Sequence, residues 1–333
     1  MRNTRRVLVA VSGLEGRAPR TLERLREEGF ELVVEDRGRA LSEDELLAAI
    51  PGIFATIASS EPYNERVLAA ADELAVIARM GVGFDRVDVA AATRHGVAVA
   101  MAFGTNHEAV ADHAFSLIAA LGSQVLPYHA KVLGGGWGGN VHSSLWRATM
   151  GIVGLGRIGK ALARRCQGFE MRILAHDIAP DRAFAERHGI ELVALDELLE
   201  QADFVSVHTP HDATTDKLIG RAQLARMKRS AYLINTSRGG TVDETALALA
   251  LAEKRIAGAG LDVMALEPLP ASSPLRTLDN VLLTPHCAGT NTRSLVDMLD
   301  RCIDSIIAIR EGRSPGDHLL LNPEVLRQPK VPR

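Results

Sequence analysis

The hydrophobic and polar positions in the N-terminal third of the chain alternate between two kinds of segment. Short runs rich in valine, isoleucine and alanine predict buried strands, at residues 7–11, 55–58, 75–78 and 97–100. Amphipathic stretches between them predict helices, for example at residues 20–28 and 43–50. This alternation of strands and helices is typical of an α/β fold with a parallel sheet.

The same alternation of predicted strands and helices begins again after Met150 and is more regular there. Further apolar runs predict strands at residues 151–153, 172–176, 204–207, 232–235, 258–262 and 281–284. These strands are enough for a complete doubly wound sheet. The sequence therefore predicts two α/β domains, each with its own parallel sheet.

Two long helices are predicted in addition to these repeats. The apolar positions of residues 106–133 recur at intervals of three and four, which predicts one unusually long helix that the glycine-rich residues 133–140 end. A second helix is expected over residues 292–310, because Pro315 prevents helical continuation beyond it. Both helices are candidate connectors between the domains.

Composition and charge narrow the class of protein. With 333 residues and 47% hydrophobic content, the chain is long enough for two domains with separate cores. Its net charge of -3 provides neither a basic field nor an acidic tail, so we expect a small-molecule partner and no nucleic acid. No apolar run approaches the ~18 residues that a membrane span requires, so we expect no membrane insertion.

The cysteines indicate a compartment. Cys166, Cys287 and Cys302 are odd in number and far apart, which indicates neither a disulfide framework nor a metal cluster. The N-terminal apolar run is shorter than the core of a signal peptide. We therefore expect a reducing, cytoplasmic location and no bound metal.

A glycine-rich turn follows the strand predicted at residues 151–153. It carries the GxGxxG spacing, with Gly154, Gly156, Arg157, Ile158 and Gly159. The first glycine permits a sharp turn, the second lets backbone amides approach a pyrophosphate, and the third lets the helix pack against the strand. The N-terminus of that helix adds partial positive charge. A glycine-rich turn without a ligand is the alternative interpretation.

Asp177 strengthens the interpretation that this turn binds a dinucleotide. It stands at the end of the next predicted strand, where a carboxylate can accept hydrogen bonds from both hydroxyls of an adenine ribose. The same carboxylate repels a 2′-phosphate, so NAD is favoured over NADP as the cofactor. An ordinary turn residue before Pro180 is the alternative, and Arg182 is close enough to weaken the preference for NAD.

Three more polar residues follow strands of the second half. Arg238, Glu267 and His286 each come after a different predicted strand. In an open parallel sheet the carboxyl ends of the strands lie along one edge, where ligands bind. The three side chains could therefore converge on one crevice.

With these residues the chain resembles the D-isomer-specific 2-hydroxyacid dehydrogenase family over nearly its whole length. The resemblance rests on the glycine turn with Asp177, His208-Thr209-Pro210, residues 235–240, residues 262–268 and Thr284-Pro285-His286. It implies a Rossmann-like NAD domain, residues 104–292, inserted into a flavodoxin-like substrate domain, residues 1–103 plus 293–333. The regulatory domain of longer phosphoglycerate dehydrogenases is not expected, because the chain ends soon after Pro323.

Arg238, Glu267 and His286 match the catalytic triad of that family and suit its chemistry. The guanidinium of Arg238 can grip a substrate carboxylate and stabilise the negative charge of the transition state. The imidazole of His286 can give or take a proton, because imidazole ordinarily titrates near pH ~6.5. Glu267 would orient that imidazole and favour its protonated form. Taken singly, the three could instead be a surface ion-pair partner, a turn residue and a core histidine.

The resemblance also implies contacts to the cofactor and the substrate. It places Asp262 at the nicotinamide carboxamide of NAD, and it lines the rest of the cofactor site with His208, Thr209, Pro210, Thr236, Ser237 and Gly289. On the substrate side it implies Arg79, Gly81, Val82 and Asn106. Backbone amides of the Arg79 loop would bind the substrate carboxylate. Residues 101–103 depart from the family pattern, which leaves the identity of the substrate open.

The sequence therefore predicts an NAD-dependent oxidoreductase acting on a D-2-hydroxy acid of the 3-phosphoglycerate or glycerate/hydroxypyruvate/glyoxylate type. The alternative is an NAD-sensing corepressor or scaffold protein, because a branch of the family keeps the triad while acting through protein contacts. We also expect a homodimer. The apolar segment from Asn106 to Leu121 would pack partly against the second subunit, or else wholly inside its own chain.

Overall fold

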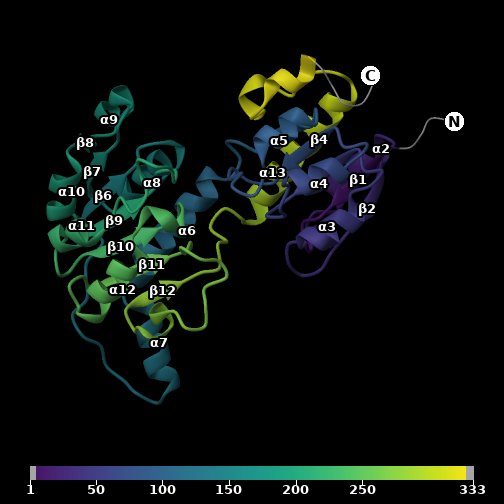
Figure 1. Cartoon of the computed structure of the whole chain (residues 1–333). Helices are drawn as coiled ribbons and strands as arrows, with labels where there is room; N and C mark the ends of the chain where they lie inside the picture. The colour runs from purple at the N-terminus through teal and green to yellow at the C-terminus, as the bar shows by residue number, and fades with distance from the viewer. Residues whose placement is uncertain (1–4, 328–333) are drawn as a thin grey trace. The chain divides into compact units, whose positions relative to one another are not determined.

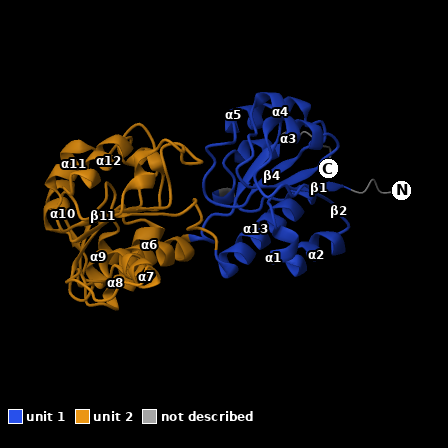
Figure 2. Cartoon of the chain, turned by 90° about the horizontal axis from the view of Figure 1, so that it is seen from below, with its two compact units in different colours: residues 1–106, 291–333 blue, residues 107–290 orange. Residues whose placement is uncertain are grey.

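The computed structural model of the protein describes residues 5–327. The chain divides into two compact units, which Figure 2 colours separately. Unit 1 contains the chain up to Asn106 and again from Asn291 onward, and unit 2 contains residues 107–290. The functional domains expected from the sequence have their boundaries at residues 103–104 and 292–293, and their assignment to substrate and cofactor stays a prediction.

Unit 1 is built on a parallel sheet of five strands in the order β2-β1-β3-β4-β5. The strands are β1 (Arg6–Val9), β2 (Glu31–Val34), β3 (Ala55–Ala58), β4 (Val76–Arg79) and β5 (Ala98–Met101). This strand order is that of flavodoxin-like sheets. The edge strand β2 is missing from the strands that the sequence predicts, and its side chains are only partly buried.

Helices cover both faces of this sheet (Figure 1). Successive side chains of β1 point to opposite faces, so that Val7 and Val9 belong to one hydrophobic core, and Leu8 to the other. Helices α1, α2 and α13 contribute to the first core, and α3, α4 and α5 to the second. Their bounds are α1 (Leu14–Arg17), α2 (Pro19–Glu27), α3 (Glu43–Ala49), α4 (Glu65–Ala70), α5 (Val89–Arg94) and α13 (Thr292–Arg310).

The C-terminal segment completes unit 1 beside β5. Leu320 forms an antiparallel bridge with that strand. The side chain of Asn322 accepts a hydrogen bond from the backbone N–H of Val99 at 2.8 Å. Short 3-10 helices, η3 (Asp317–Leu319) and η4 (Pro323–Arg327), flank these contacts. Segments from both halves of the chain therefore build unit 1.

Unit 2 is built on a parallel sheet of seven strands in the order β12-β11-β10-β9-β6-β7-β8. The strands are β6 (Thr149–Val153), β7 (Arg172–His176), β8 (Glu191–Leu192), β9 (Phe204–Val207), β10 (Tyr232–Asn235), β11 (Gly258–Leu261) and β12 (Val281–Leu283). Counted from β6, this is the Rossmann order 3-2-1-4-5-6 with β12 added at one edge. The order reverses between β6 and β9, and ligands of such sheets bind at that switch point. The two-residue strand β8 was not predicted.

Two hydrophobic cores flank the sheet of unit 2. Helices α6, α8 and α9 contribute to one core, and α10, α11 and α12 to the other. The elements are α6 (His107–Gly122), α7 (Val125–Leu133), α8 (Arg157–Gln167), α9 (Arg182–Arg187), α10 (Leu195–Gln201), α11 (Arg221–Arg226), η1 (Gly239–Thr241), α12 (Glu244–Ala252) and η2 (Pro274–Thr277). The predicted α/β fold with two doubly wound parallel sheets is confirmed.

The single helix predicted over residues 106–133 is wrong, because the chain bends by 58° between α6 and α7. Gln124 adopts a left-handed φ of 51° and interrupts the helix. Pro127 explains where the break falls: in a continuous helix it could not donate to the carbonyl of Ser123, and its ring would clash with that carbonyl. In the first turn of a new helix, proline is tolerated.

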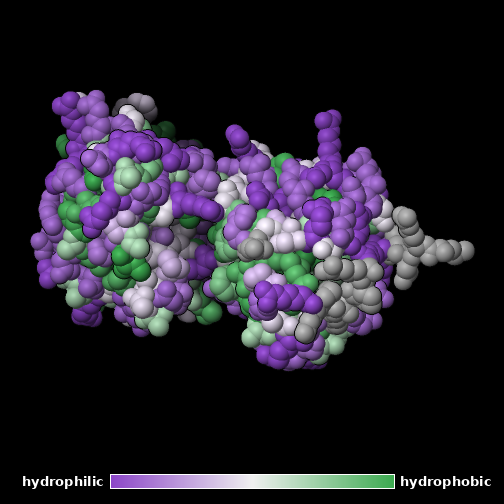
Figure 3. All heavy atoms as spheres, turned by 90° about the horizontal axis from the view of Figure 1, so that it is seen from above, coloured by the Kyte–Doolittle hydropathy of each residue, from purple (hydrophilic) through white to green (hydrophobic). Residues whose placement is uncertain are grey.

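Polar side chains dominate the visible surface of both units. In the space-filling view, hydrophilic residues cover much of the face shown for each unit (Figure 3). Within residues 5–327, no single helix is both long and apolar enough to cross a membrane, and α6 and α7 meet that requirement only when taken together as a bent pair.

Candidate active site

The glycine-rich turn lies between β6 and α8, at the switch point of the sheet in unit 2. Gly154 has a φ of 98°, and a Cβ atom on it would lie 2.9 Å from the carbonyl of His208. A Cβ on Gly159 would lie 2.2 Å from the carbonyl oxygen of Gly154. A Cβ on Gly156, by contrast, would meet nothing within 4 Å. The chain itself requires the first and third glycines, while the second faces open space into which a ligand can approach the backbone.

Asp177 connects this turn to the end of β7. Its Oδ2 atom accepts a hydrogen bond from the backbone N–H of Leu155 at 2.7 Å, and its Oδ1 atom accepts one from Ala179 at 2.8 Å. A carboxylate offers about four acceptor positions, so these two bonds leave capacity for a ligand. The structure thus places Asp177 beside the glycine turn and adds a structural bond that the sequence did not indicate.

Three buried polar atoms along the same edge have no hydrogen-bond partner within residues 5–327. They are His208 Nδ1, Thr209 Oγ1 and Thr236 Oγ1, which follow the neighbouring strands β9 and β10. Buried polar atoms are nearly always paired in native structures, so partners from outside the chain are expected here. Together with the open space at Gly156, these atoms fit a bound dinucleotide.

His208 is unsuited to acid–base work near neutral pH. Its Nε2 atom lies 2.9 Å from Ser206 Oγ, and its Nδ1 atom is buried. Burial lowers the pKa of His208 from the ordinary 6.5 to about 4. The ring is therefore neutral at physiological pH, which agrees with the interpretation that His208 shapes the cofactor site and is not a second proton donor.

The depressed pKa of His208 has a consequence for stability. Between pH 6.5 and about 4, the imidazole of His208 is protonated in the unfolded chain but stays neutral in the folded protein. The free energy of unfolding therefore falls as the pH falls through this window. The expected loss from this residue is roughly 3 kcal/mol. Urea denaturation at a series of pH values should show a shallower acid slope for His208→Gln than for wild type. Equal slopes would contradict the assignment.

Asn235 organises the turn that carries Arg238. Its Oδ1 atom accepts hydrogen bonds from the backbone N–H and the hydroxyl of Ser237, at 3.0 and 2.8 Å, and its Nδ2 atom donates to the carbonyl of Arg238 at 3.0 Å. The guanidinium of Arg238 donates to the carbonyl of Ser237 at 2.7 Å. The next residue, Gly239, lies so close to Met264 that a Cβ would stand 2.0 Å from its carbonyl. The turn after β10 therefore packs directly on the loop after β11.

That loop after β11 carries Glu267, which pairs with His286. Glu267 Oε2 lies 2.7 Å from His286 Nδ1, and Oε1 accepts the backbone N–H of Met264 at 3.0 Å. Burial alone would raise the pKa of Glu267, but the hydrogen bonds from His286 and Met264 outweigh it and lower the pKa. The side chains of Glu267 and His286 remain 36% and 50% exposed, so small molecules can reach them.

Asp262 fixes the loop that presents His286. Its carboxylate is almost fully buried and accepts hydrogen bonds from the Thr284 hydroxyl at 2.6 Å and from the backbone N–H groups of Cys287 and Ala288, each at 2.9 Å. The backbone carbonyl of Asp262 accepts a hydrogen bond from the backbone N–H of His286 at 2.8 Å. His286 itself adopts a left-handed φ of 53°. Burial opposes ionisation of Asp262, yet these hydrogen bonds keep its pKa below the usual range. The contact to a nicotinamide carboxamide stays a prediction.

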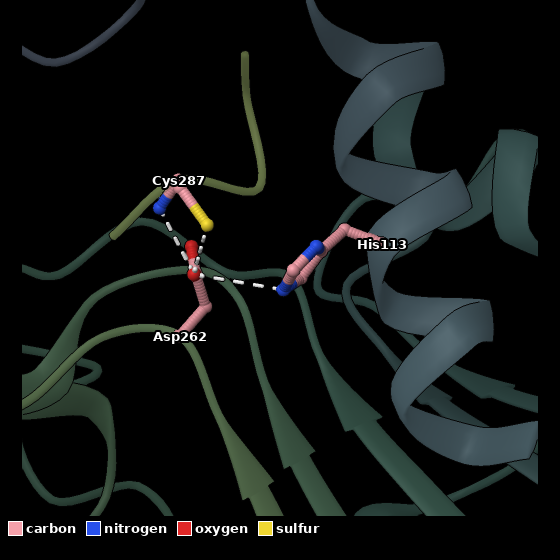
Figure 4. A group of neighbouring side chains, drawn as sticks. All are labelled: His113, Asp262 and Cys287. Carbon is pink, nitrogen blue, oxygen red and sulfur yellow. Dashed lines mark hydrogen bonds and ion pairs between the residues drawn. The ribbon is translucent and has the colours of Figure 1, made fainter. Parts of the chain in front are cut away.

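His113 is a site residue that sequence reasoning missed. It projects from α6 toward Asp262, as Figure 4 shows, and its Nε2 atom lies 3.6 Å from Asp262 Oδ1. The same nitrogen lies 2.9 Å from Thr284 Oγ1. Its position in the apolar stripe of α6 makes it look like a core residue. The available signal was that a histidine at such a position needs polar partners when it is buried.

The remaining predicted cofactor residues lie along the carboxyl edge of the same sheet. Arg157 and Ile158 begin α8, Pro210 follows His208, and Gly289 lies in the loop after β12. Thr236 and Ser237 are buried directly after β10. Each lies at the sheet edge where ligands of such folds bind, and the contacts themselves stay predictions.

The predicted substrate residues lie in unit 1. Arg79 ends β4, and its guanidinium folds over its own loop to donate to the carbonyl of Met80 at 2.8 Å. Gly81 has a φ of 136°, which only glycine adopts readily, and Val82 follows it. Asn106 is buried at the end of the unit's first segment. Their roles in substrate binding stay predictions.

The glycine turn and the loops that carry Arg238, Glu267 and His286 lie in a part of the chain that matches a known protein family. The model of the D-isomer specific 2-hydroxyacid dehydrogenase family, NAD binding domain, matches residues 115–288. The chain belongs to this family. The predicted family, the NAD cofactor and the enzyme class of this 2-hydroxyacid dehydrogenase are thereby confirmed.

The proteins that are similar to this dehydrogenase match it over different shares of their length. It is 42% identical to the glyoxylate reductase of Korarchaeum cryptofilum, over 80% of this chain and 82% of that protein. It is 35% identical to the D-3-phosphoglycerate dehydrogenase of Archaeoglobus fulgidus, over 86% of this chain but 55% of that protein, so it spans about half of this relative. The crystal structure of the TT0316 protein from Thermus thermophilus superposes with a TM-score of 0.86 at 36% identity, covering 95% of this chain and 99% of that one.

Proposed function

We propose that this enzyme interconverts a D-2-hydroxy acid and its 2-oxo acid, with a small substrate of the glyoxylate, hydroxypyruvate, glycerate or 3-phosphoglycerate type. One observation carries the proposal: the carboxylate of Glu267 lies 2.7 Å from the imidazole of His286, on loops at the same sheet edge as the glycine turn. The similarity to a glyoxylate reductase and to a phosphoglycerate dehydrogenase supports this range of substrates.

The geometry of the Glu267–His286 pair supports the roles proposed for these two side chains, and the chemistry of the guanidinium supports the role proposed for Arg238. Bound NAD supplies the hydride donor or acceptor. Because Nδ1 of His286 is engaged by Glu267, the proton passes between the substrate oxygen and Nε2. The carboxylate of Glu267 stabilises the imidazolium before this proton leaves it, and Arg238 holds the substrate carboxylate while it stabilises the negative charge on the reacting oxygen.

A panel of 2-oxo acids assayed with NADH tests this function. Glyoxylate, hydroxypyruvate, 3-phosphohydroxypyruvate and one bulkier 2-oxo acid should be included. Turnover of at least one of the first three, with formation of only the D-hydroxy acid, is the expected result. Tight NADH binding with negligible turnover of every acid would favour the corepressor or scaffold function instead.

The preference for NAD is attributed to the charge of Asp177. The best variant is Asp177→Asn, because its amide oxygen can still accept the N–H of Leu155 while the charge is gone. The ratio of kcat/KM for NADH to that for NADPH should fall by about 10- to 100-fold, since a hydrogen bond to a charged group contributes roughly 1.5–3 kcal/mol. Asp177→Ala should change the ratio in the same direction. An unchanged ratio in both variants would remove this assignment.

We also propose that the enzyme is a homodimer that associates through α7 and the loop after it. No side chain of α7 is buried. Leu133 on α7 is 75% exposed, and Trp137 and Val141 in the following loop are 86% and 100% exposed. A second copy would cover this apolar surface with the same surface, related by a two-fold axis. Light scattering at two protein concentrations should give the mass of a dimer.

The cysteines are compatible with a reducing compartment, and we keep a cytoplasmic location as a proposal. Cys166, Cys287 and Cys302 are all free thiols. Burial raises the pKa of Cys166 and of Cys302 to about 12, so both are unreactive as nucleophiles.

A further inference from the structure

Three side chains from different elements of unit 2 meet next to the His286 loop. His113 comes from α6, Asp262 follows β11, and Cys287 follows β12 (Figure 4). A nitrogen, an oxygen and a sulfur atom from these residues all lie within 4.8 Å of one another. They are far apart in the sequence, so no spacing motif indicates the group.

Two of the three separations within this group match those of a tetrahedral zinc site. Both His113 Nε2 and Cys287 Sγ lie 3.6 Å from Asp262 Oδ1. With bonds of about 2.0–2.2 Å to nitrogen or oxygen and about 2.3 Å to sulfur, neighbouring ligands of tetrahedral Zn²⁺ are about 3.4–3.6 Å apart. The remaining separation, between sulfur and nitrogen, lies within 4.8 Å, and binding of the ion would require it to shorten.

The chemistry of the three ligands also suits this ion. Imidazole, thiolate and carboxylate are the ligands that Zn²⁺ takes in proteins, and three of them leave a fourth position for water. The carboxylate of Asp262 is oriented by hydrogen bonds that it accepts from the Thr284 hydroxyl and from the N–H groups of Cys287 and Ala288. The rigid main-chain bonds hold its carboxylate in place for the other two ligands.

Two ligand atoms have to lose a hydrogen before they can bind the ion. The Thr284 hydroxyl donates to Asp262, so it accepts from His113, which requires a hydrogen on Nε2 of His113. On metal binding the imidazole would carry its hydrogen on Nδ1 instead, and the Cys287 thiol would release its proton to the solvent. Cys287 is only half-buried, which gives the ion and the proton a path.

We propose that His113, Asp262 and Cys287 form a binding site for a thiophilic divalent cation, with Zn²⁺ as the ion that fits it. The ion would join α6 to the loop that carries His286. Because Cys287 is adjacent to His286, occupancy should also slow the dehydrogenase reaction, a consequence that rests on the proposed function and is measured separately from binding.

Metal titration of the full chain tests the site without any assay of activity. Calorimetry with Zn²⁺ should show one ion per chain, and Co²⁺ in its place should give a thiolate-to-metal charge-transfer absorption. Cys287→Ser should abolish that absorption. Both Cys287→Ser and His113→Gln should raise the Kd for Zn²⁺ by at least about tenfold, since even partners of the ligands typically contribute 10- to 100-fold to affinity.

A matched variant and a second measurement keep the outcome decisive. Cys166→Ala removes a buried thiol elsewhere in unit 2 and should leave both metal signals unchanged. In the wild-type protein, Zn²⁺ should also protect Cys287 from alkylation, as mass spectrometry of the modified peptide reports. No stoichiometric Zn²⁺ binding, or full alkylation of Cys287 at saturating Zn²⁺, would overturn the proposal whether or not the enzyme proves active.

Discussion

His286→Ala is expected to lower kcat for 2-oxo acid reduction by about 10²–10⁴-fold, the range that a positioned acid or base supplies. The variant removes the only group of the Glu267–His286 pair that can carry a proton to the substrate at neutral pH, while Asp262 continues to hold the backbone of the loop. Steady-state kinetics with NADH and the best acid of the substrate panel measures the effect. The Kd for NADH, from fluorescence titration, should change little.

A histidine of unit 1 provides the control for this variant. His95 follows α5 and also lies 2.7 Å from a carboxylate, that of Glu65 at the start of α4. His95→Ala should leave kcat within a factor of about two, because an exposed ion pair of this kind contributes about 0–1 kcal/mol, and contributes it to stability and not to the reaction. If His286→Ala keeps more than about a tenth of the wild-type kcat, His286 is not the proton donor.

The strands were predictable because most of them are continuous apolar runs buried on both faces of a parallel sheet. The strand β9, for example, has the bounds expected from its apolar run. The exceptions have physical causes. The edge strand β2 is half-exposed, and β8 has only two residues, so neither has a strong pattern. The bend after α6 depends on Pro127 and on a left-handed Gln124, which a count of apolar positions does not register.

The candidate site was predictable to the extent that it depends on strand order. Because the carboxyl ends of parallel strands share an edge, Glu267 and His286 could be expected to meet there, and they do. The contact of Gly239 with Met264 shows that the Arg238 turn reaches the same loop.

The supporting contacts could not be predicted, because they join residues that no motif connects. The network of His113, Thr284 and Asp262 links a helix to two loops through side-chain geometry alone. Periodicity assigns His113 to the apolar face of α6, and only the packed structure shows what its imidazole contacts. The contact of Asp262 with the cofactor stays a prediction, and the structure adds its hydrogen bonds to the main chain around His286, which no motif indicated.

Arg238→Lys is expected to lower kcat/KM for the 2-oxo acid by about 10²–10³-fold, as loss of an oxyanion-stabilising donor does. Lysine keeps the positive charge but loses the planar fork that can hold two oxygens at once. Asn235 bonds to the main chain of this turn, so the backbone should keep its arrangement. The effect should therefore fall on both KM for the acid and kcat, with the Kd for NADH unchanged.

Arg255→Lys is the matched control for this last variant. Arg255 also donates to a main-chain carbonyl, that of Met227 at 2.9 Å, but it precedes β11 and so lies at the amino edge of the same sheet. Its replacement should lower the stability of unit 2 slightly, by about 1 kcal/mol, and leave kcat/KM near the wild-type value. If Arg238→Lys and Arg255→Lys lose activity equally, the loss is caused by disturbance of the sheet. Arg238 would then not bind the substrate. A loss confined to Arg238→Lys would show that the fork itself contacts the acid.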